Sequence, residues 1–164
     1  MIKNHQENFI TVMGIDPGLA TTGYGIIRSN GREHEILKAH YLKTSPKVDH
    51  FERLHYIFTE INNLMIEYHP KEIAIESQFV SKNVRSAISV AEARTVAILA
   101  ASMHEIDIFS YAPTEIKESI TGYGKADKQQ VLEMVQALVP MNEKKLMYDT
   151  SDAIAIALTR IHEW

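Results

Sequence analysis

Cysteine is absent from this sequence of 164 residues. Its absence excludes a disulfide scaffold, a thiolate metal site and a cysteine nucleophile, and it suits a reducing compartment. Long hydrophobic runs are lacking too, because stretches such as TVAILAA fall far short of the ~20 apolar residues that cross a bilayer. We therefore expect a cytoplasmic protein without a membrane-spanning segment.

An excess of positive charge is also missing. The 17 lysines and arginines face 21 aspartates and glutamates, which gives a net charge of −4. A nucleic-acid site would therefore have to be a local basic patch. The length and the 45% hydrophobic content suit one domain, which we expect to span residues 10–164. Residues 1–9 are expected to form a disordered or extended N-terminal segment.

Hydrophobic patterning predicts alternating strands and helices. The strand pattern occurs in five segments, residues 9–16, 22–29, 33–44, 72–76 and 107–113. Helical spacing occurs in residues 49–68, 83–105, 128–139 and 149–162, with a short helical turn over 114–120. Asn83 and Asp127 are candidate N-caps, and the small residues Ala153, Ala155 and Ala157 allow the last helix to lie close to a sheet. Three successive strands followed by alternating strands and helices predict an α/β fold, a mixed sheet covered by helices on both faces.

Four acidic residues stand where the predicted elements begin or end. Asp16 closes the first strand, Glu76 closes the fourth, and Asp149 and Asp152 open the last helix. If the two strands are parallel neighbours, their acids lie side by side at the edge where ligands gather, and the two aspartates share one helical face. Clustered carboxylates without histidine or cysteine favour Mg²⁺ or Mn²⁺ over zinc. Two such ions together can hydrolyse a phosphodiester.

Most of these acids also have a purely structural explanation. Asp16 precedes Pro-Gly and fits an Asx turn, while Asp149 and Asp152 suit the first turn of a helix as capping acids. Glu76 is harder to explain in this way, because strands disfavour a glutamate beside the core. The four placements taken together favour a metal site.

The motifs around these acids resemble those of the RuvC family of bacterial Holliday junction resolvases. The matching stretches are GIDPGLATTGYGII, IAIESQFVSKNVRSAISVAEARTVAILAA, YAPTEIKESITGYGKADKQQV and DTSDAIAIALTR. The resemblance implies an RNase H-like (retroviral-integrase-like) fold and a Mg²⁺-dependent endonuclease of recombination and repair, with Mn²⁺ as a substitute ion. It further implies paired incisions in four-way junction DNA that leave 5′-phosphate and 3′-hydroxyl ends, a homodimer, and a partnership with the RuvA and RuvB branch-migration proteins.

Carried over position by position, the resemblance assigns the catalytic and metal-binding roles to Asp16, Glu76, Asp149 and Asp152. It also implies that Phe79 lies against unstacked bases, that basic residues near the scissile phosphate fall on Lys117 and Lys128, and that residues 84–103 form much of a dimer interface.

Other residues complete the expected DNA surface. Lys82 and Arg85 form a basic rim beside the aromatic Phe79, and Lys125 flanks the glycine loop TGYG. An aromatic after a strand is often a core residue, and lysines around a glycine loop are often solvated surface. In the helix over 84–103, the series Ala87, Ala91 and Ala97 fits packing on a sheet as well as self-pairing.

Three other functions compete with junction cleavage. The stretch DPGLATTG resembles the phosphate loop of actin-like ATPases and sugar kinases, but those proteins need two such domains and this chain has room for one. An RNase H-like nuclease acting on another nucleic acid is a second alternative, and a non-catalytic junction-binding scaffold is a third. Four intact acids argue against a scaffold, which gains nothing from their mutual repulsion.

Overall fold

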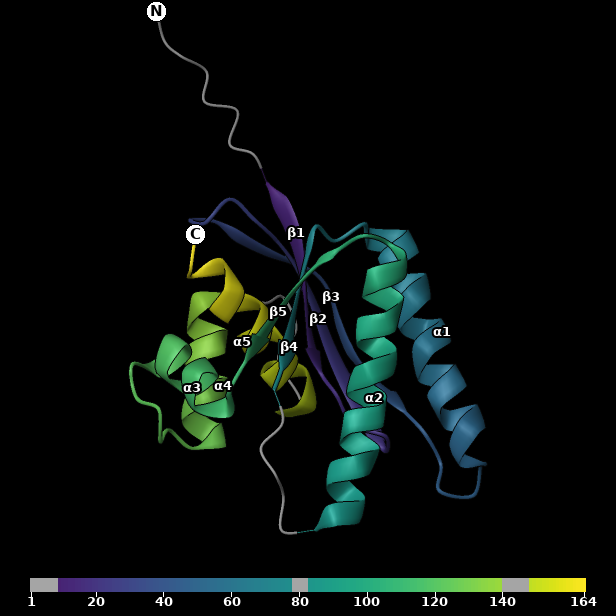
Figure 1. Ribbon diagram of the computed structural model, residues 1–164. Coiled ribbons are helices and arrows are strands. Elements are labelled where there is room, and N and C mark those ends of the chain that lie inside the picture. Colours follow the sequence, from purple (N-terminus) through teal and green to yellow (C-terminus); the bar gives the residue numbers. More distant parts are fainter. Residues whose placement is uncertain (1–8, 78–82, 140–147) are drawn as a thin grey trace, which may run out of the picture.

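A mixed sheet of five strands forms the centre of the computed structural model, which describes residues 9–77, 83–139 and 148–164, apart from the side chains of residues 148 and 149. The strands are β1 (Ile10–Asp16), β2 (Thr21–Ser29), β3 (His34–Lys43), β4 (Glu72–Glu76) and β5 (Asp107–Tyr111). Their order is β3-β2-β1-β4-β5; the first three pair antiparallel, and β4 pairs parallel with both β1 and β5 (Figure 1). The predicted five-stranded mixed sheet is confirmed.

The parallel pairing of β1 with β4 determines where their terminal acids lie. Ile15 is opposite Ile75, so the next residues, Asp16 and Glu76, reach the same edge of the sheet. Both isoleucines are fully buried because helices cover the sheet on each side. The expected neighbourhood of the first and fourth strands is therefore confirmed.

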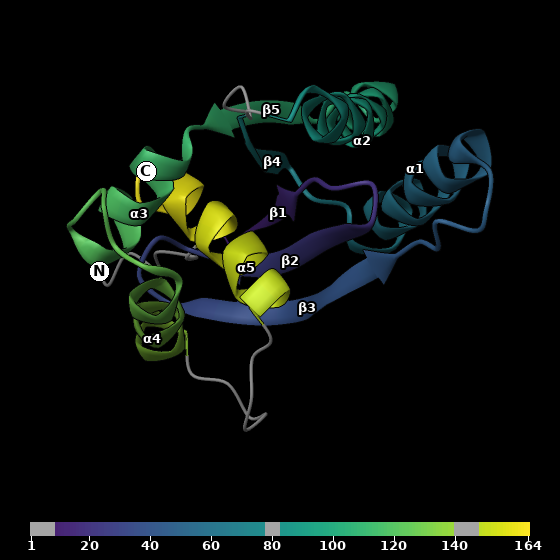
Figure 2. The ribbon, with the colours of Figure 1, turned by 90° about the horizontal axis from the view of Figure 1, so that it is seen from below.

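Helices cover both faces of the sheet, as Figure 2 shows. One face carries α1 (His50–Tyr68) and α2 (Val84–Met103), and the other carries α3 (Pro113–Thr121), α4 (Lys128–Leu138) and α5 (Tyr148–Ile161). Successive side chains of a strand point to opposite faces, so Met13 of β1 packs in the core with α1 and α2, whereas Val12 packs in the core with α5. The sheet thus separates two apolar cores.

Helix α5 lies very close to the sheet because small residues meet at the contact. A Cβ placed on Gly14 of β1 would be 2.1 Å from the carbonyl oxygen of Ala153, and one on Gly25 of β2 would be 2.9 Å from Cγ1 of Ile154. Neither position has room for a side chain. The close approach expected from the alanines of the last helix is confirmed at Ala153 and Ala157, and glycines on the sheet side complete it.

Capping signals in the sequence predicted the starts of α2 and α4 correctly. Oδ1 of Asn83 accepts hydrogen bonds from the backbone N–H groups of Arg85 and Ser86, and Asp127 accepts one from Gln130 at 2.9 Å. The short turn predicted over 114–120 is instead a nine-residue helix. Proline begins this helix at position 113, and a glycine in the left-handed region ends it at position 122.

Helix α2 presents an apolar stripe to solvent. The α2 face, as we name it, consists of exposed residues that share one side of the helix: Val84, Ile88, Ala91, Thr95, Leu99 and Met103. The opposite side is buried at Ala93, Ala97 and Ala100. The alanine series noted in the sequence therefore divides, with Ala97 in the core and Ala91 on the α2 face.

By length and composition alone, α2 could cross a bilayer. It has 20 residues; an 18-residue stretch of it has a mean hydropathy of 1.3, and only 22% of that stretch is buried within the chain. Two charged residues near its middle contact other elements. Oε2 of Glu92 lies 2.9 Å from Nε2 of His50 in α1, and Arg94 donates a hydrogen bond to the backbone at the end of β4. These contacts are typical of a helix packed within a folded chain, and the absence of a membrane segment stays a prediction.

Candidate active site

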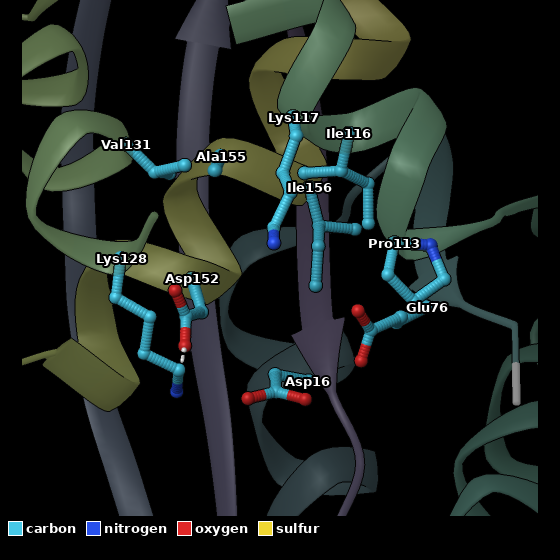
Figure 3. Close-up of a pocket in the computed structure, with 10 residues that line it drawn as sticks. All are labelled: Asp16, Glu76, Pro113, Ile116, Lys117, Lys128, Val131, Asp152, Ala155 and Ile156. Carbon is cyan, nitrogen blue, oxygen red and sulfur yellow. Dashed lines mark hydrogen bonds and ion pairs between the residues drawn. The ribbon is translucent and has the colours of Figure 1, made fainter. Parts of the chain in front are cut away.

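Carboxylates from three elements line one cavity at the edge of the sheet. Asp16 ends β1, Glu76 ends β4 and Asp152 lies near the start of α5, and their side chains surround a cavity of about 340 Å³ (Figure 3). The first two meet because their strands are parallel neighbours. The third is brought to the same edge by the close packing of α5 on Gly14. Three of the four predicted acids are thus found together.

The fourth predicted acid is only partly described. Asp149 belongs to α5 and precedes Asp152 by three positions, which puts the two residues on one side of the helix. The side chain of Asp149 lies outside the described residues. Its participation in the site stays a prediction.

Two lysines share the cavity with the acids. Lys117 of α3 and Lys128 of α4 both line it, and Nζ of Lys128 lies 3.2 Å from Oδ2 of Asp152. In Figure 3 the amine of Lys117 points down toward the carboxylates from above, whereas Lys128 approaches beside Asp152. The lysines therefore compensate part of the negative charge of the cavity.

Burial and the crowded charges of the cavity shift the pKa of Glu76. Its pKa is raised above the ordinary value, first by burial and then by the negative charge of Asp152. The ammonium groups of Lys128 and Lys117 and a hydrogen bond with Asp16 oppose this shift without cancelling it. The cavity thus favours additional positive charge.

The ligand chemistry of the cavity fits a hard divalent cation. Its charged acceptors are carboxylates, and among the described residues no histidine lines it. Oxygen ligands of this kind suit Mg²⁺ and Mn²⁺. Within the described part of the chain, no three acidic or histidine groups stand close enough together to hold an ion, and the ammonium of Lys128 lies beside one of the acids. Donor type and excess charge therefore support a cation, while the acids lie farther apart than bound ligands would.

The walls of the cavity are apolar, and the sequence did not identify these residues as parts of the site. They are formed by Pro113, Ile116, Val131, Ala155 and Ile156. Helical spacing identified such residues as packing positions, but the side that faces the cavity is decided by how α3, α4 and α5 pack. An apolar wall lowers the local dielectric and strengthens charge interactions inside the cavity.

Two of the other residues predicted to contact DNA, Lys125 and Arg85, are not brought to the acids. Lys125 is exposed just before α4, and Arg85 is exposed in the first turn of α2; neither lines the cavity. Phe79 and Lys82 lie outside the described residues. Their contacts with DNA stay predictions.

One residue linked to the site was missed in the sequence. Nε of Arg94 in α2 donates a hydrogen bond to the backbone carbonyl of Glu76 at 3.3 Å, and its Nη2 donates one to Oγ of Ser110 at 2.7 Å. The available signal was an arginine inside the largely apolar stretch ARTVAILAA. The sequence does not reveal its partners, because α2, β4 and β5 approach one another only in the folded chain.

Comparisons with known proteins agree with this architecture. The family profile described as "Crossover junction endodeoxyribonuclease RuvC" matches residues 12–160. The protein of that name from Caldicellulosiruptor saccharolyticus is 42% identical over 151 residues, which cover 92% of this chain and 91% of the relative. The one from Pasteurella multocida is 41% identical over 151 residues, which cover 92% of this chain and 78% of the relative.

Solved structures give the same relationship. The structure of T. thermophilus RuvC in complex with Holliday junction substrate is similar to this chain with a TM-score of 0.88 and 28% identity, over 94% of both chains. The yeast mitochondrial Holliday junction resolvase shares the fold at a TM-score of 0.68 and 14% identity, over 92% of this chain and 77% of that one. The predicted RNase H-like fold class is confirmed.

Proposed function

This chain belongs to the RuvC family of crossover junction endodeoxyribonucleases, and we propose that it resolves Holliday junctions with the acidic cavity at the ends of β1 and β4 as its active site. The observation that carries the assignment is the meeting of Asp16, Glu76 and Asp152 from three separate elements on one cavity. A scaffold has no use for this arrangement, because burial and mutual repulsion make it unfavourable, as the raised pKa of Glu76 indicates.

Divalent ions complete the site in this proposal, and Mg²⁺ is the species we expect. The residues that would hold them are Asp16, Glu76, Asp149 and Asp152. When bound, such ions activate the attacking water and stabilise charge on the leaving oxygen. The carboxylates must be ionised to act as ligands, and in the ion-free protein the lysines of the cavity favour the ionised form of Glu76.

The two lysines hold the scissile phosphate in this proposal. Lys117 and Lys128 place positive charge in the same cavity as the acids, where a phosphodiester oxygen needs compensation. The ammonium of Lys128 can exchange its carboxylate partner, Asp152, for a phosphate oxygen when DNA enters. The apolar walls exclude water and so strengthen both interactions.

Two copies of the chain pair through the α2 face in this proposal. Resolution of a junction needs two symmetric incisions, and the described part of one chain supplies one acidic cavity. The α2 face is apolar, exposed and continuous along the helix, which suits an isologous contact between two copies. The family resemblance gives the same role to residues 84–103.

Several further assignments rest on the resemblance or on the sequence alone. Residues 10–164 act as one nuclease domain in the cytoplasm, and RuvA and RuvB are its partners in branch migration. Four residues extend the DNA surface beyond the cavity: Phe79, Lys82, Arg85 and Lys125.

The test compares Asp16→Asn with the unaltered protein on a synthetic four-way junction in Mg²⁺. The unaltered protein should make paired nicks with 5′-phosphate and 3′-hydroxyl ends, and the variant should bind the junction without cutting it. Asp107→Asn is the matched control, because Asp107 begins β5 opposite Glu72, at the other end of the sheet from the cavity. It should cut at the rate of the unaltered protein.

Two results would contradict the assignment. If Asp16→Asn still cuts the junction, the acidic cavity is not the active site. Equal cutting of a linear duplex or an RNA of the same sequence would replace junction resolution by a different nuclease activity.

A further inference from the structure

The carbonyl end of β4 is held from the side of the sheet that faces away from the acidic cavity. The ladder between β1 and β4 ends at the pair Ile15 and Ile75, so Glu76 stands beyond it. There Nε of Arg94 donates a hydrogen bond to the carbonyl oxygen of Glu76. Strand β4 therefore contacts α2 at Glu76 itself, through the backbone of this residue.

Strand alternation shows that Arg94 does not itself reach into the cavity. Ile73 and Ile75 of β4 pack in the core with α1 and α2, whereas Ala74 packs in the core with α5. Glu76 lies two residues after Ala74, and residues two apart in a strand point to the same face of the sheet. The side chain of Glu76 therefore points to the α5 side and into the cavity. Arg94 belongs to α2 and contacts only the backbone of Glu76 among the acids described.

The same guanidinium also binds the neighbouring strand. Its Nη2 donates to Oγ of Ser110 in β5 at 2.7 Å, and Ser110 is paired in register with Ile75. One side chain thus links α2 to the ends of two parallel strands. A guanidinium suits this role, because its planar fork offers several donors in fixed directions, whereas the single ammonium of a lysine is a point charge.

We propose that Arg94 is a positioning residue that fixes the backbone of Glu76 and thereby the direction of its carboxylate into the ion-binding cavity. This inference rests on the proposed role of Glu76 as a metal ligand. Arg94 and the α2 face belong to the same helix, so the contact also ties the proposed pairing surface to the proposed active site. A change in the position of α2 would therefore act on the backbone of Glu76 through this hydrogen bond, in addition to the core packing of α2 on β4.

The experiment measures Mn²⁺ binding to the DNA-free protein by the electron paramagnetic resonance of the unbound ion, together with Mg²⁺-dependent junction cleavage. Arg94→Met should bind Mn²⁺ roughly tenfold more weakly, which is the lower end of the loss seen when a supporting partner of a metal ligand is removed. It should need a correspondingly higher Mg²⁺ concentration for half-maximal cleavage. Arg94→Lys should recover part of the affinity, and junction binding without divalent ions should not change.

Two variants separate positioning from a general loss of stability. Arg160 binds Glu72 at the opposite end of β4, where its Nε and Nη2 donate to the two carboxylate oxygens at 2.8 and 3.1 Å. Arg160→Met removes these bonds, so it should lower the melting temperature without changing Mn²⁺ affinity. Ser110→Ala leaves the bond between Arg94 and Glu76 in place and should bind Mn²⁺ normally.

Glu76→Gln distinguishes failure of the inference from failure of the proposed site. If Glu76→Gln loses Mn²⁺ affinity while Arg94→Met and Arg94→Lys keep it, the inference is wrong and the proposed function stands. If Glu76→Gln also binds Mn²⁺ normally, the proposed ion site is wrong and the inference fails with it. An equal loss of affinity in Arg160→Met would assign the effect to stability and overturn the positioning role.

Discussion

The carbonyl oxygen of Ala153 occupies the space that a side chain at Gly14 would need. A Cβ at Gly14 would lie 2.1 Å from that oxygen and 2.6 Å from the backbone nitrogen of Ala157. Both neighbours are backbone atoms of α5, so neither can be relieved by a change of rotamer. This contact sets the distance between α5 and the central strand β1. It therefore also sets how far Asp152 of α5 lies from Asp16 of β1.

Gly14→Ala should therefore destabilise the fold and impair cleavage together. Overpacking of a filled core costs typically about 1–3 kcal/mol, and here it moves the helix that carries Asp152. Thermal unfolding should show the lower stability, and junction cleavage well below the melting temperature should be slower. Thr11→Ala, a partly buried position at the start of the same strand, is the control. An unchanged melting temperature for Gly14→Ala would contradict the close contact.

Glu76→Gln should make the ion-free protein more stable at neutral pH while abolishing cleavage. The pKa of Glu76 is raised in the folded state, so the folded protein holds this proton more tightly than the unfolded chain does. Stability from this group is present at acid pH and is lost as pH rises through the folded pKa. Glu76→Gln has no charge at this position, so the variant does not lose this stability as pH rises.

Thermal melts in a chelator check this prediction over a range of pH. The difference between Glu76→Gln and the unaltered protein should be largest at neutral pH and should disappear below the ordinary pKa of a glutamate. Glu118→Gln, at an exposed position of α3, is the control and should show no such trend. A variant that is less stable than the unaltered protein at neutral pH would refute the electrostatic explanation.

Lys128→Met should separate ion binding from turnover. The ammonium of Lys128 pairs with Asp152, but it is 70% exposed, and an exposed ion pair contributes only about 0.2–1 kcal/mol, equivalent to at most about a fivefold change in affinity. We expect tighter Mn²⁺ binding within that limit, because the competing charge is gone, and a lower maximal rate of cleavage. Lys125→Met, outside the cavity, should leave Mn²⁺ affinity unchanged. Weaker Mn²⁺ binding by Lys128→Met would contradict the competition.

Ile88→Glu should convert a dimer into monomers. Ile88 is 53% exposed on the α2 face, in the second turn of the helix, where pairing would bury an unpaired charge. Light scattering after size-exclusion chromatography gives the mass, and supercoiled plasmids with a cruciform show whether two strands are cut in one binding event. Met134→Glu, at an exposed apolar residue of α4, is the matched control. A dimeric Ile88→Glu protein would place the pairing surface elsewhere.

Features governed by neighbours in the sequence could be predicted, whereas several features governed by distant contacts could not. Asn83 and Asp127 were identified as N-caps because a cap acts within its own helix turn. Asp16 and Glu76 were placed correctly because each stands at the end of an apolar strand. The helical period marks a face without naming what covers it, so the sequence left Ala91 and Ala97 undecided between sheet packing and self-pairing.

The contact of Arg94 with Glu76 illustrates the remaining limit. An arginine on a helix has many possible acceptors, and only the folded arrangement of α2 against β4 and β5 selects two of them. The cavity walls were missed for the same reason, because apolar residues of α3 and α5 had to be oriented by tertiary packing before one side of each helix could be assigned to the site.

The assembly of the cavity from β1, β4 and α5 also has a consequence for biosynthesis. Asp16 lies in β1 and Asp152 in α5, so the acids become neighbours only after the segment up to residue 152 has been made. Contacts between such distant segments form late in folding, since closing long loops must precede them. If the cavity is the active site, as proposed, a nascent chain in which α5 has not yet packed on the sheet cannot cut DNA.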